Sequence, residues 1–224
     1  MGVDVTKILD GLKDYGPKFV LIVRHGELDN PTNIVYNRDS VMKIPIHLSD
    51  LGKDHMRKTG KLIKVRAFNL TKILVSPETR AQESAHELNS ELNLPTETVD
   101  DLDDVFAPYP YQQGWTMDKL IELEGNNYIL PDSETPESVT QRILQTFSKT
   151  AADLKVGQAA ILLSHGDPIA FLANMLDSNS IPDPKNLRNL IYPAKGQALV
   201  AVIGPDGKLF TLYLLNEESG KSTY

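Results

Sequence analysis

Residues 19–26 are Phe-Val-Leu-Ile-Val-Arg-His-Gly: five apolar residues followed directly by Arg-His-Gly. A second run at 159–163, Ala-Ala-Ile-Leu-Leu, ends in Ser-His-Gly at 164–166. Short continuous apolar runs are typical of strands buried on both faces of a parallel sheet. Each run therefore predicts a strand that delivers a histidine to the mouth of a sheet, followed by a glycine that lets backbone or ligand approach closely.

The rest of the chain alternates short apolar segments with amphipathic ones. Further strands are expected at 72–76, 198–203 and 209–215, the last two joined as an antiparallel hairpin by Gly-Pro-Asp-Gly-Lys at 204–208. Helices are expected at 49–66, 77–92, 115–124, 135–154 and 168–176. Start signals include Ser49-Asp50 and Pro77 in a first turn. The pattern predicts an α/β fold, a three-layer α/β/α sandwich around a mostly parallel sheet.

The length of 224 residues is enough for one large α/β domain, and no repeat or long linker divides it. We expect an N-terminal extension at 1–17, a single domain at 18–216 and a C-terminal tail at 217–224.

Composition restricts the class of protein. Apolar residues make up 41% and charged residues 24%, as in ordinary folded domains. The sequence has no apolar run long enough to cross a membrane and no secretory signal at its start, so we expect a cytoplasmic protein without membrane contact. It has no cysteine, which excludes disulfides, thiolate catalysis and cysteine-bound metal.

Charge restricts the partners. The net charge is −7, from 30 acidic and 23 basic residues, which argues against a nucleic-acid partner. A few arginines that converge on one cleft can still bind a small anion in an acidic molecule.

A third predicted strand end, at 72–76, is followed by Arg80 in the first turn of the next helix. Taken alone, Arg80 would be interpreted as a surface residue paired with Glu78 or Glu83. In a parallel sheet, however, this strand end faces the same side as those of His25 and His165, and ligands bind outside such ends. Two arginines and two histidines that meet there form a site for a dianion, because guanidinium groups bind phosphoryl oxygens bidentately.

The motifs around these residues resemble the signatures of the histidine phosphatase (phosphoglycerate mutase-like) superfamily. They are Arg24-His25-Gly26-Glu27, Ser76-Pro77-x-x-Arg80-Ala81-x-Glu83-Ser84-Ala85 and Ser164-His165-Gly166-Asp167-Pro168, in the family's order. Two more segments resemble family motifs with substitutions: Ile46-His47-Leu48-Ser49-x-x-Gly52, and Pro136-Glu137-Ser138 with Arg142. The resemblance implies a phosphoglycerate mutase-like fold and metal-independent hydrolysis of a small phosphate ester.

The resemblance also implies a role for each matched residue. His25 would be the nucleophile that forms a phosphohistidine. Arg24 and Arg80 would hold the phosphoryl oxygens and lower the pKa of His25, and His165 would donate a hydrogen bond to the phosphoryl group. Since the arginines supply the positive charge, neither a metal nor a cofactor is expected.

The general acid has a weaker match. Many family members carry a Glu two residues after a Leu in a segment that resembles Leu-x-Glu, and the same count from Leu102 arrives at Asp104. Asp103 is the rival, and a solvated acidic run at 100–104 without a catalytic role is the alternative.

Substrate-binding residues are expected beside the two histidines. They are Gly26, Glu27 and Gly166. After the motif that ends in Glu27, the family often places an Asn that helps to bind the phosphoryl group. Here that point falls on Pro31, and we assign the role to the neighbouring Asn30, with Asn33 as the other choice.

Two other functions stay open. One is phosphoglycerate mutase activity, although the chain lacks the Trp-Asn run after residue 26 and has Tyr-Pro-Tyr at 109–111 where resembling mutases are basic. The other is a non-catalytic module that binds phosphoesters on the same fold. The sequence does not name the substrate and does not decide whether the protein forms a homodimer.

Overall fold

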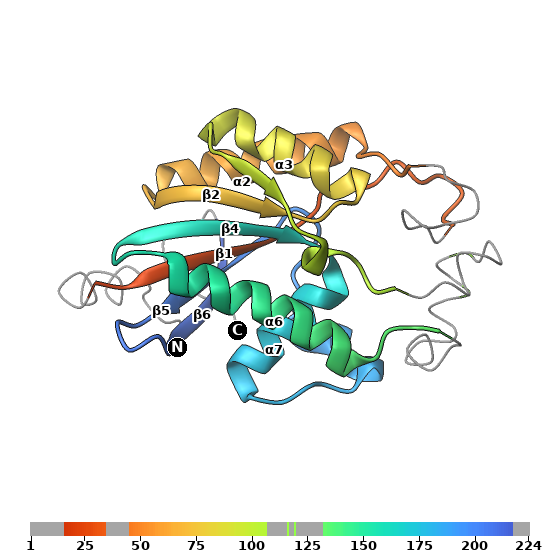
Figure 1. The fold of residues 1–224 in the computed structure, drawn as a ribbon. Helices are drawn as coiled ribbons and strands as arrows, with labels where there is room; N and C mark the ends of the chain where they lie inside the picture. Colours follow the sequence, from red (N-terminus) through yellow and green to blue (C-terminus); the bar gives the residue numbers. More distant parts are fainter. Residues whose placement is uncertain (1–15, 35–44, 107–115, 117–118, 120–131, 217–224) are drawn as a thin grey trace.

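The computed structural model describes residues 16–34, 45–106, 116, 119 and 132–216. Within them, one six-stranded sheet has the order β3-β2-β4-β1-β5-β6 (Figure 1). The strands are β1 (Lys18–Arg24), β2 (Asn69–Val75), β3 (Thr96–Thr98), β4 (Gln158–Ser164), β5 (Ala198–Ile203) and β6 (Leu209–Leu215). The helices are α2 (Asp50–Val65), α3 (Thr79–Leu92), α6 (Pro136–Asp153) and α7 (Gly166–Ser178), with 3₁₀ turns η2 (Asp100–Leu102) and η4 (Pro184–Asn189).

The direction of the strands confirms the predicted fold class. Strands β3, β2, β4 and β1 are parallel to one another, β5 is antiparallel to β1, and β6 is antiparallel to β5, with which it forms the predicted hairpin. Helices α2 and α3 cover one face of the sheet, and α6 and α7 cover the other (Figure 1). Within the described ranges, none of the helices is both long and apolar enough to span a lipid bilayer.

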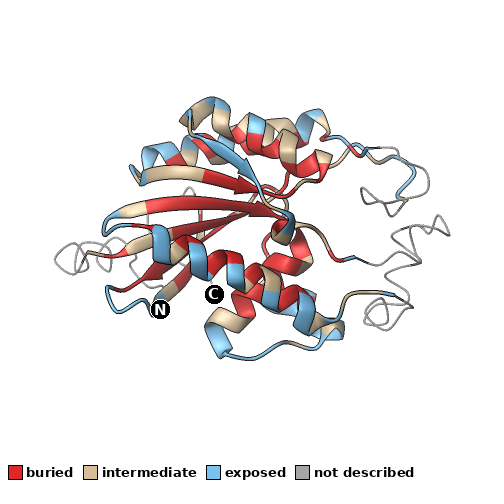
Figure 2. Cartoon of the chain, in the orientation of Figure 1, coloured by how far each residue is buried: buried red, intermediate tan, exposed pale blue. Residues whose placement is uncertain are grey.

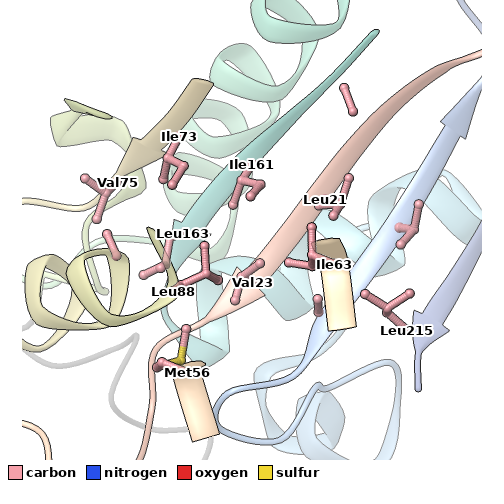
Figure 3. Packing of buried hydrophobic residues seen from close by; sticks show 14 of the residues in the cluster. Leu21, Val23, Met56, Ile63, Ile73, Val75, Leu88, Ile161, Leu163 and Leu215 are labelled. Atoms are coloured by element: carbon pink, nitrogen blue, oxygen red, sulfur yellow. The ribbon is translucent and has the colours of Figure 1, made fainter. Parts of the chain in front are cut away.

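The alternation of side chains along β1 explains why helices cover both faces. Leu21 and Val23 belong to the core under α2 and α3, which Figure 3 shows together with Met56. Val20 and Ile22 belong to the core under α6 and α7. All four β1 residues are fully buried, and burial is concentrated in the central strands and the inner helix faces (Figure 2). Each such side chain contributes about 1.5–3 kcal/mol to folding.

Two helices begin at other residues than expected, β2 begins at Asn69 instead of residue 72, and one strand is additional. Helix α3 begins at Thr79, because Glu78 is extended and its N–H bonds to Ser76 Oγ at 3.2 Å, so Pro77 lies outside the first turn. Helix α7 begins at Gly166, with His165 as its N-cap. Strand β3 was not expected: its three residues are polar and exposed, so no apolar pattern marks it.

Some expectations fall outside the described residues. The expected helix at 115–124 has only residues 116 and 119 described, and the terminal segments at 1–15 and 217–224 are not described. The proposed division into extension, domain and tail stays a prediction.

The fold brings four strand ends together at one edge of the sheet. Arg24 is opposite Ser164, and Val75 is opposite both Leu163 and Thr98. The residues that follow β1, β2 and β4 therefore lie side by side, and the chain beyond β3 arrives at the same edge.

Candidate active site

His25 lies directly after β1 and is 4% exposed. Its backbone N–H donates to Ser164 O at 3.1 Å, which ties it to the end of β4. Its ring Nδ1 is 2.8 Å from Gly26 O. A carbonyl oxygen can only accept, so Nδ1 carries the hydrogen and Nε2 carries the lone pair of a neutral ring. This is the tautomer in which Nε2 can act as a nucleophile.

The backbone around this histidine is held by a loop from the far end of the chain. Arg24 N donates to Gln197 O at 3.0 Å, and Gly196 N donates to the carbonyls of Arg24 and His25 at 3.1 and 3.0 Å. The Arg24 guanidinium donates to Pro193 O at 2.9 Å and lies 5.0 Å from the centre of the Tyr192 ring. Its buried Nε has no hydrogen-bond partner among the described residues. The loop at 192–197 thus fixes both residues of the Arg-His pair.

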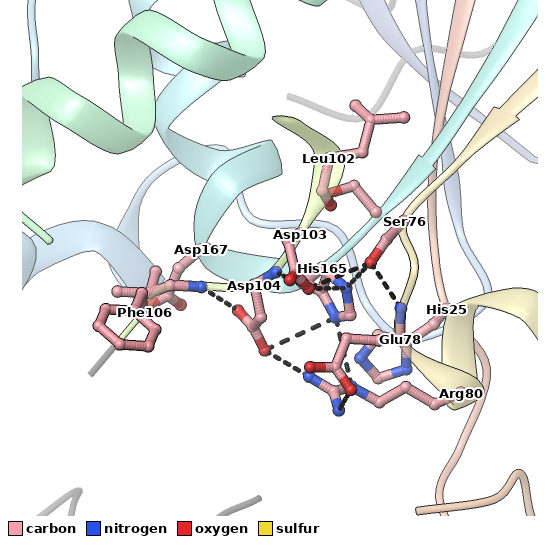
Figure 4. Close-up of polar contacts among 12 residues, drawn as sticks. His25, Ser76, Glu78, Arg80, Leu102, Asp103, Asp104, Phe106, His165 and Asp167 are labelled. Atoms are coloured by element: carbon pink, nitrogen blue, oxygen red, sulfur yellow. Dashed lines mark hydrogen bonds and ion pairs between the residues drawn. The ribbon is translucent and has the colours of Figure 1, made fainter. Parts of the chain in front are cut away.

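Arg80, in the first turn of α3, is 4% exposed and sits among acidic groups and a histidine (Figure 4). Its Nε donates to His165 Nδ1 at 3.3 Å, one terminal nitrogen to Glu78 at 3.1 Å, and the other to Asp104 Oδ2 at 2.9 Å. The pairing with Glu78 weighed in the sequence is present, but it is buried in the site and does not place Arg80 on the surface.

His165 is fully buried, and its ring centre is 5.2 Å from that of His25. Because Nδ1 accepts from Arg80, the hydrogen is on Nε2, which donates to Ser76 Oγ at 2.8 Å. Ser76 Oγ in turn donates to Asp103 Oδ1 at 3.3 Å. The expected donation from His165 to a substrate oxygen needs the hydrogen on Nδ1 and stays a prediction.

The two candidate acids occupy different places (Figure 4). Asp103 is bound to the Ser76 hydroxyl and to its neighbour's N–H at 2.8 Å. Asp104 pairs with Arg80, lies 3.6 Å from His165 Nδ1 and has a side chain 29% exposed. Of the two, Asp104 is the carboxylate at the Arg80–His165 face of the site.

Both site histidines are neutral for the same main reason. Burial lowers the pKa of His25 well below 6.5, and His165, Arg80 and Arg24 add to the effect. Burial also lowers the pKa of His165, with further effects from Arg80, Arg142 and Arg24. The arginines therefore act in the expected direction, but desolvation is the larger cause.

The predicted substrate-binding residues are placed as follows. A side chain at Gly26 would lie 2.7 Å from Gly52 O, and one at Gly166 would overlap the Tyr192 hydroxyl, so both glycines permit close packing at the site. Glu27 forms an ion pair with Lys195; desolvation opposes ionisation, but this ammonium outweighs it and lowers the pKa of Glu27.

Asn30 is engaged in its own loop. Its side chain donates to Ile34 O at 2.8 Å and accepts from Thr32 at 3.3 Å. No described contact brings it to the two histidines, and its substrate-binding role stays a prediction.

Several site residues were not assigned from the sequence. Ser76 stands in a quoted motif but was given no role, and it contacts His165. Tyr192 and Lys195 contact Asp167 and Glu27, but they come from a loop with no apolar period or reactive motif to mark it. For this loop the one signal was the Pro-Ala-Lys-Gly stretch at 193–196, which indicates a turn; Gly196 indeed has φ +78°.

The arrangement provides a neutral imidazole with its lone pair on Nε2, two arginines, a second histidine and a partly exposed carboxylate. These are the groups needed to bind a phosphoryl group, attack it and protonate a leaving oxygen. Among the described residues, no group of three or more His, Asp or Glu side chains is arranged to hold a metal ion.

Comparison with known proteins gives similarity in both sequence and fold. The chain is 27% identical over 150 residues to the uncharacterized phosphatase PhoE of Bacillus subtilis, covering 67% of this chain and 72% of that protein. In structure it is similar to Bacillus stearothermophilus YhfR, with a TM-score of 0.71 at 18% identity, covering 92% of this chain and 98% of that one.

Other similar structures carry more specific names. The α-ribazole phosphatase of Shigella flexneri has a TM-score of 0.69 at 18% identity, with 92% of this chain and all of that chain covered. A mycobacterial glucosyl-3-phosphoglycerate phosphatase has a TM-score of 0.67 at 16% identity, with the same two coverages. At such low sequence identity, these TM-scores show a shared fold and nothing more.

The model of the histidine phosphatase superfamily (branch 1) matches residues 20–217, which include every residue of the site described above. This match supports a phosphatase activity, and by it the chain belongs to the histidine phosphatase superfamily.

Proposed function

We propose that the protein is a metal-independent phosphomonoester hydrolase that works through a phosphohistidine on His25. In the first step, His25 Nε2 attacks phosphorus, the N–P bond forms and the bond to the ester oxygen breaks, while Asp104 gives that oxygen a proton. In the second step, water gives its proton to Asp104 and attacks the phosphohistidine, which releases inorganic phosphate and the neutral ring.

One observation carries this proposal: the hydrogen bond from His25 Nδ1 to Gly26 O at 2.8 Å. It orients the ring and keeps the lone pair on Nε2. Burial then keeps the ring unprotonated, since it lowers the pKa of His25.

The cations around the ring support the same step. Arg80 and Arg24 bring two positive charges to a site that is largely shielded from water, where charge developing on phosphoryl oxygens is stabilised most strongly. The buried Nε of Arg24, without a partner among the described residues, is a donor available to such an oxygen.

The test is to trap the intermediate. The protein is mixed with a phosphate-labelled aryl phosphate, quenched in base and digested; label should appear on the peptide with His25, stable in base and labile in acid. His25→Asn should abolish the label. Label on Ser76, Ser164 or an aspartate would contradict the mechanism, and so would a strict need for added Mg²⁺ after treatment with a chelator.

We also propose that the substrate is a small phosphorylated metabolite. Two similar structures are named for phosphatases of α-ribazole and glucosyl-3-phosphoglycerate, both small molecules. A panel of phosphorylated metabolites, read by release of inorganic phosphate, tests this, and transfer of the phosphoryl group to a second hydroxyl without release would point to mutase chemistry instead.

A further inference from the structure

Arg142 on α6 lies beside the acidic segment, defined as residues 101–104, and all five of its N–H donors have partners there or nearby. Its side chain is 16% exposed. One terminal nitrogen donates to the carbonyls of Asp101 and Asp103 at 2.8 and 2.7 Å, and the other donates to the Asp104 carbonyl at 2.9 Å. Nε and the second terminal nitrogen bind both oxygens of Glu134 at 2.9 and 3.0 Å. Five donors meet five acceptors, which is the full capacity of a guanidinium group.

Arg142 thus acts as a clamp on the acidic segment, and Glu134 holds the chain two residues further along, at Phe106. Its side chain accepts from Phe106 N at 2.9 Å, and its backbone N–H donates to Phe106 O at 2.7 Å. Ser164, at the end of β4, donates to the Leu102 carbonyl at 2.6 Å. The acidic segment is therefore held at its backbone by α6, by the chain that enters α6 and by the central strand.

This arrangement fixes where the two carboxylates point. Once the carbonyls of Asp103 and Asp104 face Arg142, their side chains face Ser76 and Arg80 (Figure 4). The charge of Arg142 is also among the causes, after burial and Arg80, that lower the pKa of His165.

We infer that Arg142 is a positioning residue that acts through Asp104: it holds the proton donor at the leaving-oxygen side of the phosphoryl site. This inference rests on the proposed function. Arg142 itself does not touch the substrate, because its donors are already committed to the acidic segment and Glu134.

Lysine cannot replace this arginine. It keeps the positive charge but offers three donors from one point, so it cannot reach three carbonyls and both oxygens of Glu134 together. Arg142→Lys therefore loosens the acidic segment while it keeps the charge near His165.

The kinetic experiment compares an alkyl ester, glycerol 2-phosphate, with an aryl ester, 4-nitrophenyl phosphate. An aryl leaving group needs little help from an acid, whereas an alkoxide needs much. For Arg142→Lys we expect kcat to fall about 10- to 100-fold on the alkyl ester and less than about 3-fold on the aryl ester, since small misplacements of a catalytic group carry costs of this order. Glu134→Gln should reduce kcat less than Arg142→Lys does, and again more on the alkyl ester than on the aryl ester.

Two further measurements separate positioning from general damage. Arg142→Lys should add no further loss on the alkyl ester when Asp104 is already Asn. Amide hydrogen exchange at 102–106 should speed up in Arg142→Lys. The matched control is Arg57→Lys, which alters a partly exposed pair with Glu87 between α2 and α3 and should change neither readout.

Equal losses on both esters, additive losses with Asp104→Asn, or unchanged exchange would each overturn the inference. Failure of the proposed function has a different signature: the unaltered protein would release no phosphate and form no adduct on His25. The exchange measurement would then still decide whether Arg142 clamps the acidic segment, while its catalytic role would fall with the function.

Discussion

Two adjacent carboxylates in the site, Asp103 and Asp104, are bound to different partners and so should have separable effects. Asp103 accepts from Ser76, which is bound to His165, so it orients that ring. Asp104 pairs with Arg80 and has the more exposed side chain of the two. The second is therefore the one that we propose as the proton donor to a leaving oxygen.

Asp104→Asn should therefore reduce kcat on an alkyl phosphate by about 10²–10⁴-fold and affect an aryl phosphate far less. Asp103→Asn should lower kcat on both esters to the same extent, because it disturbs the hydrogen bonds between His165 and Ser76 that both reactions share. Steady-state kinetics on both esters decide the matter. A selective loss in Asp103→Asn would exchange the two roles, and a selective loss in neither would place the acid elsewhere, with Glu27 or Asp167 next to be tested.

Arg80→Lys tests the guanidinium group at constant charge. A lysine cannot bind His165, Glu78 and Asp104 at once and cannot hold two phosphoryl oxygens, so kcat should fall by about 10²-fold or more. Thermal unfolding followed by circular dichroism should show the variant folded. Turnover within about 2-fold of the unaltered protein, as we expect for Arg57→Lys, would mean that Arg80 has no part in phosphoryl chemistry.

At the scale of elements, the end of β1 and the start of α2 meet through two glycines. A side chain at Gly52 would overlap the carbonyl oxygen of Glu27 and lie 2.7 Å from the backbone nitrogen of Glu27. A side chain at Gly26 would lie 2.7 Å from Gly52 O. Both obstacles are backbone atoms, which cannot rotate away. The close approach lets Ser49, the N-cap of α2, bond to Glu27 O and so anchors the chain after His25.

Gly52→Ala should destabilise the protein, although helix propensity alone would predict a gain in stability. Alanine favours a helix over glycine by about 0.8–1.0 kcal/mol, yet the overlap with Glu27 should make the variant less stable by about 1–3 kcal/mol. Urea unfolding measures the difference. Leu51→Ala is the control, since Leu51 is 55% exposed on the same turn and should change stability by about 0.5 kcal/mol or less. A more stable Gly52→Ala would show that the two elements do not pack this closely.

At the scale of the whole molecule, the neutral histidines make stability depend on pH. The fold lowers the pKa of His25 and His165, so both stay neutral below pH 6.5 while the unfolded chain takes up protons. Unfolding then binds protons, so stability falls as pH falls. Their contribution is complete above about pH 6.5, the ordinary value. The carboxylates with lowered pKa, Glu27 and Glu83, lose their contribution only below 4.5.

Between pH 6.5 and 5.5, each of the two histidines should therefore reduce the free energy of unfolding by up to about 1.4 kcal/mol per pH unit. Urea titrations across this range measure the slope. His25→Asn should flatten it, whereas His86→Asn, at an exposed position on α3, serves as the control. A slope unchanged in His25→Asn would mean that the buried ring is not held neutral by the fold.

The amino-acid order alone determined the layers of the molecule and the edge that carries the site. The apolar runs before Arg24 and at 159–163 gave buried parallel strands because nearly every side chain in them faces a helix layer. Parallel strands end on the same side, so the positions of His25, Arg80 and His165 at one edge followed from local pattern and sheet topology.

Only the tertiary structure decided which groups each of these side chains binds. The different partners of Asp103 and Asp104, the clamp by Arg142 and the loop at 192–197 rest on hydrogen bonds between segments that are distant in the sequence. Arg24 and Pro193, for instance, are 169 residues apart. The nitrogen of His25 that carries the lone pair is set by a bond to its neighbour Gly26, but only the packed structure gives the ring that orientation. Polar contacts of this kind have no sequence period, since they depend on the direction of individual N–H and C=O groups after the strands and helices have packed.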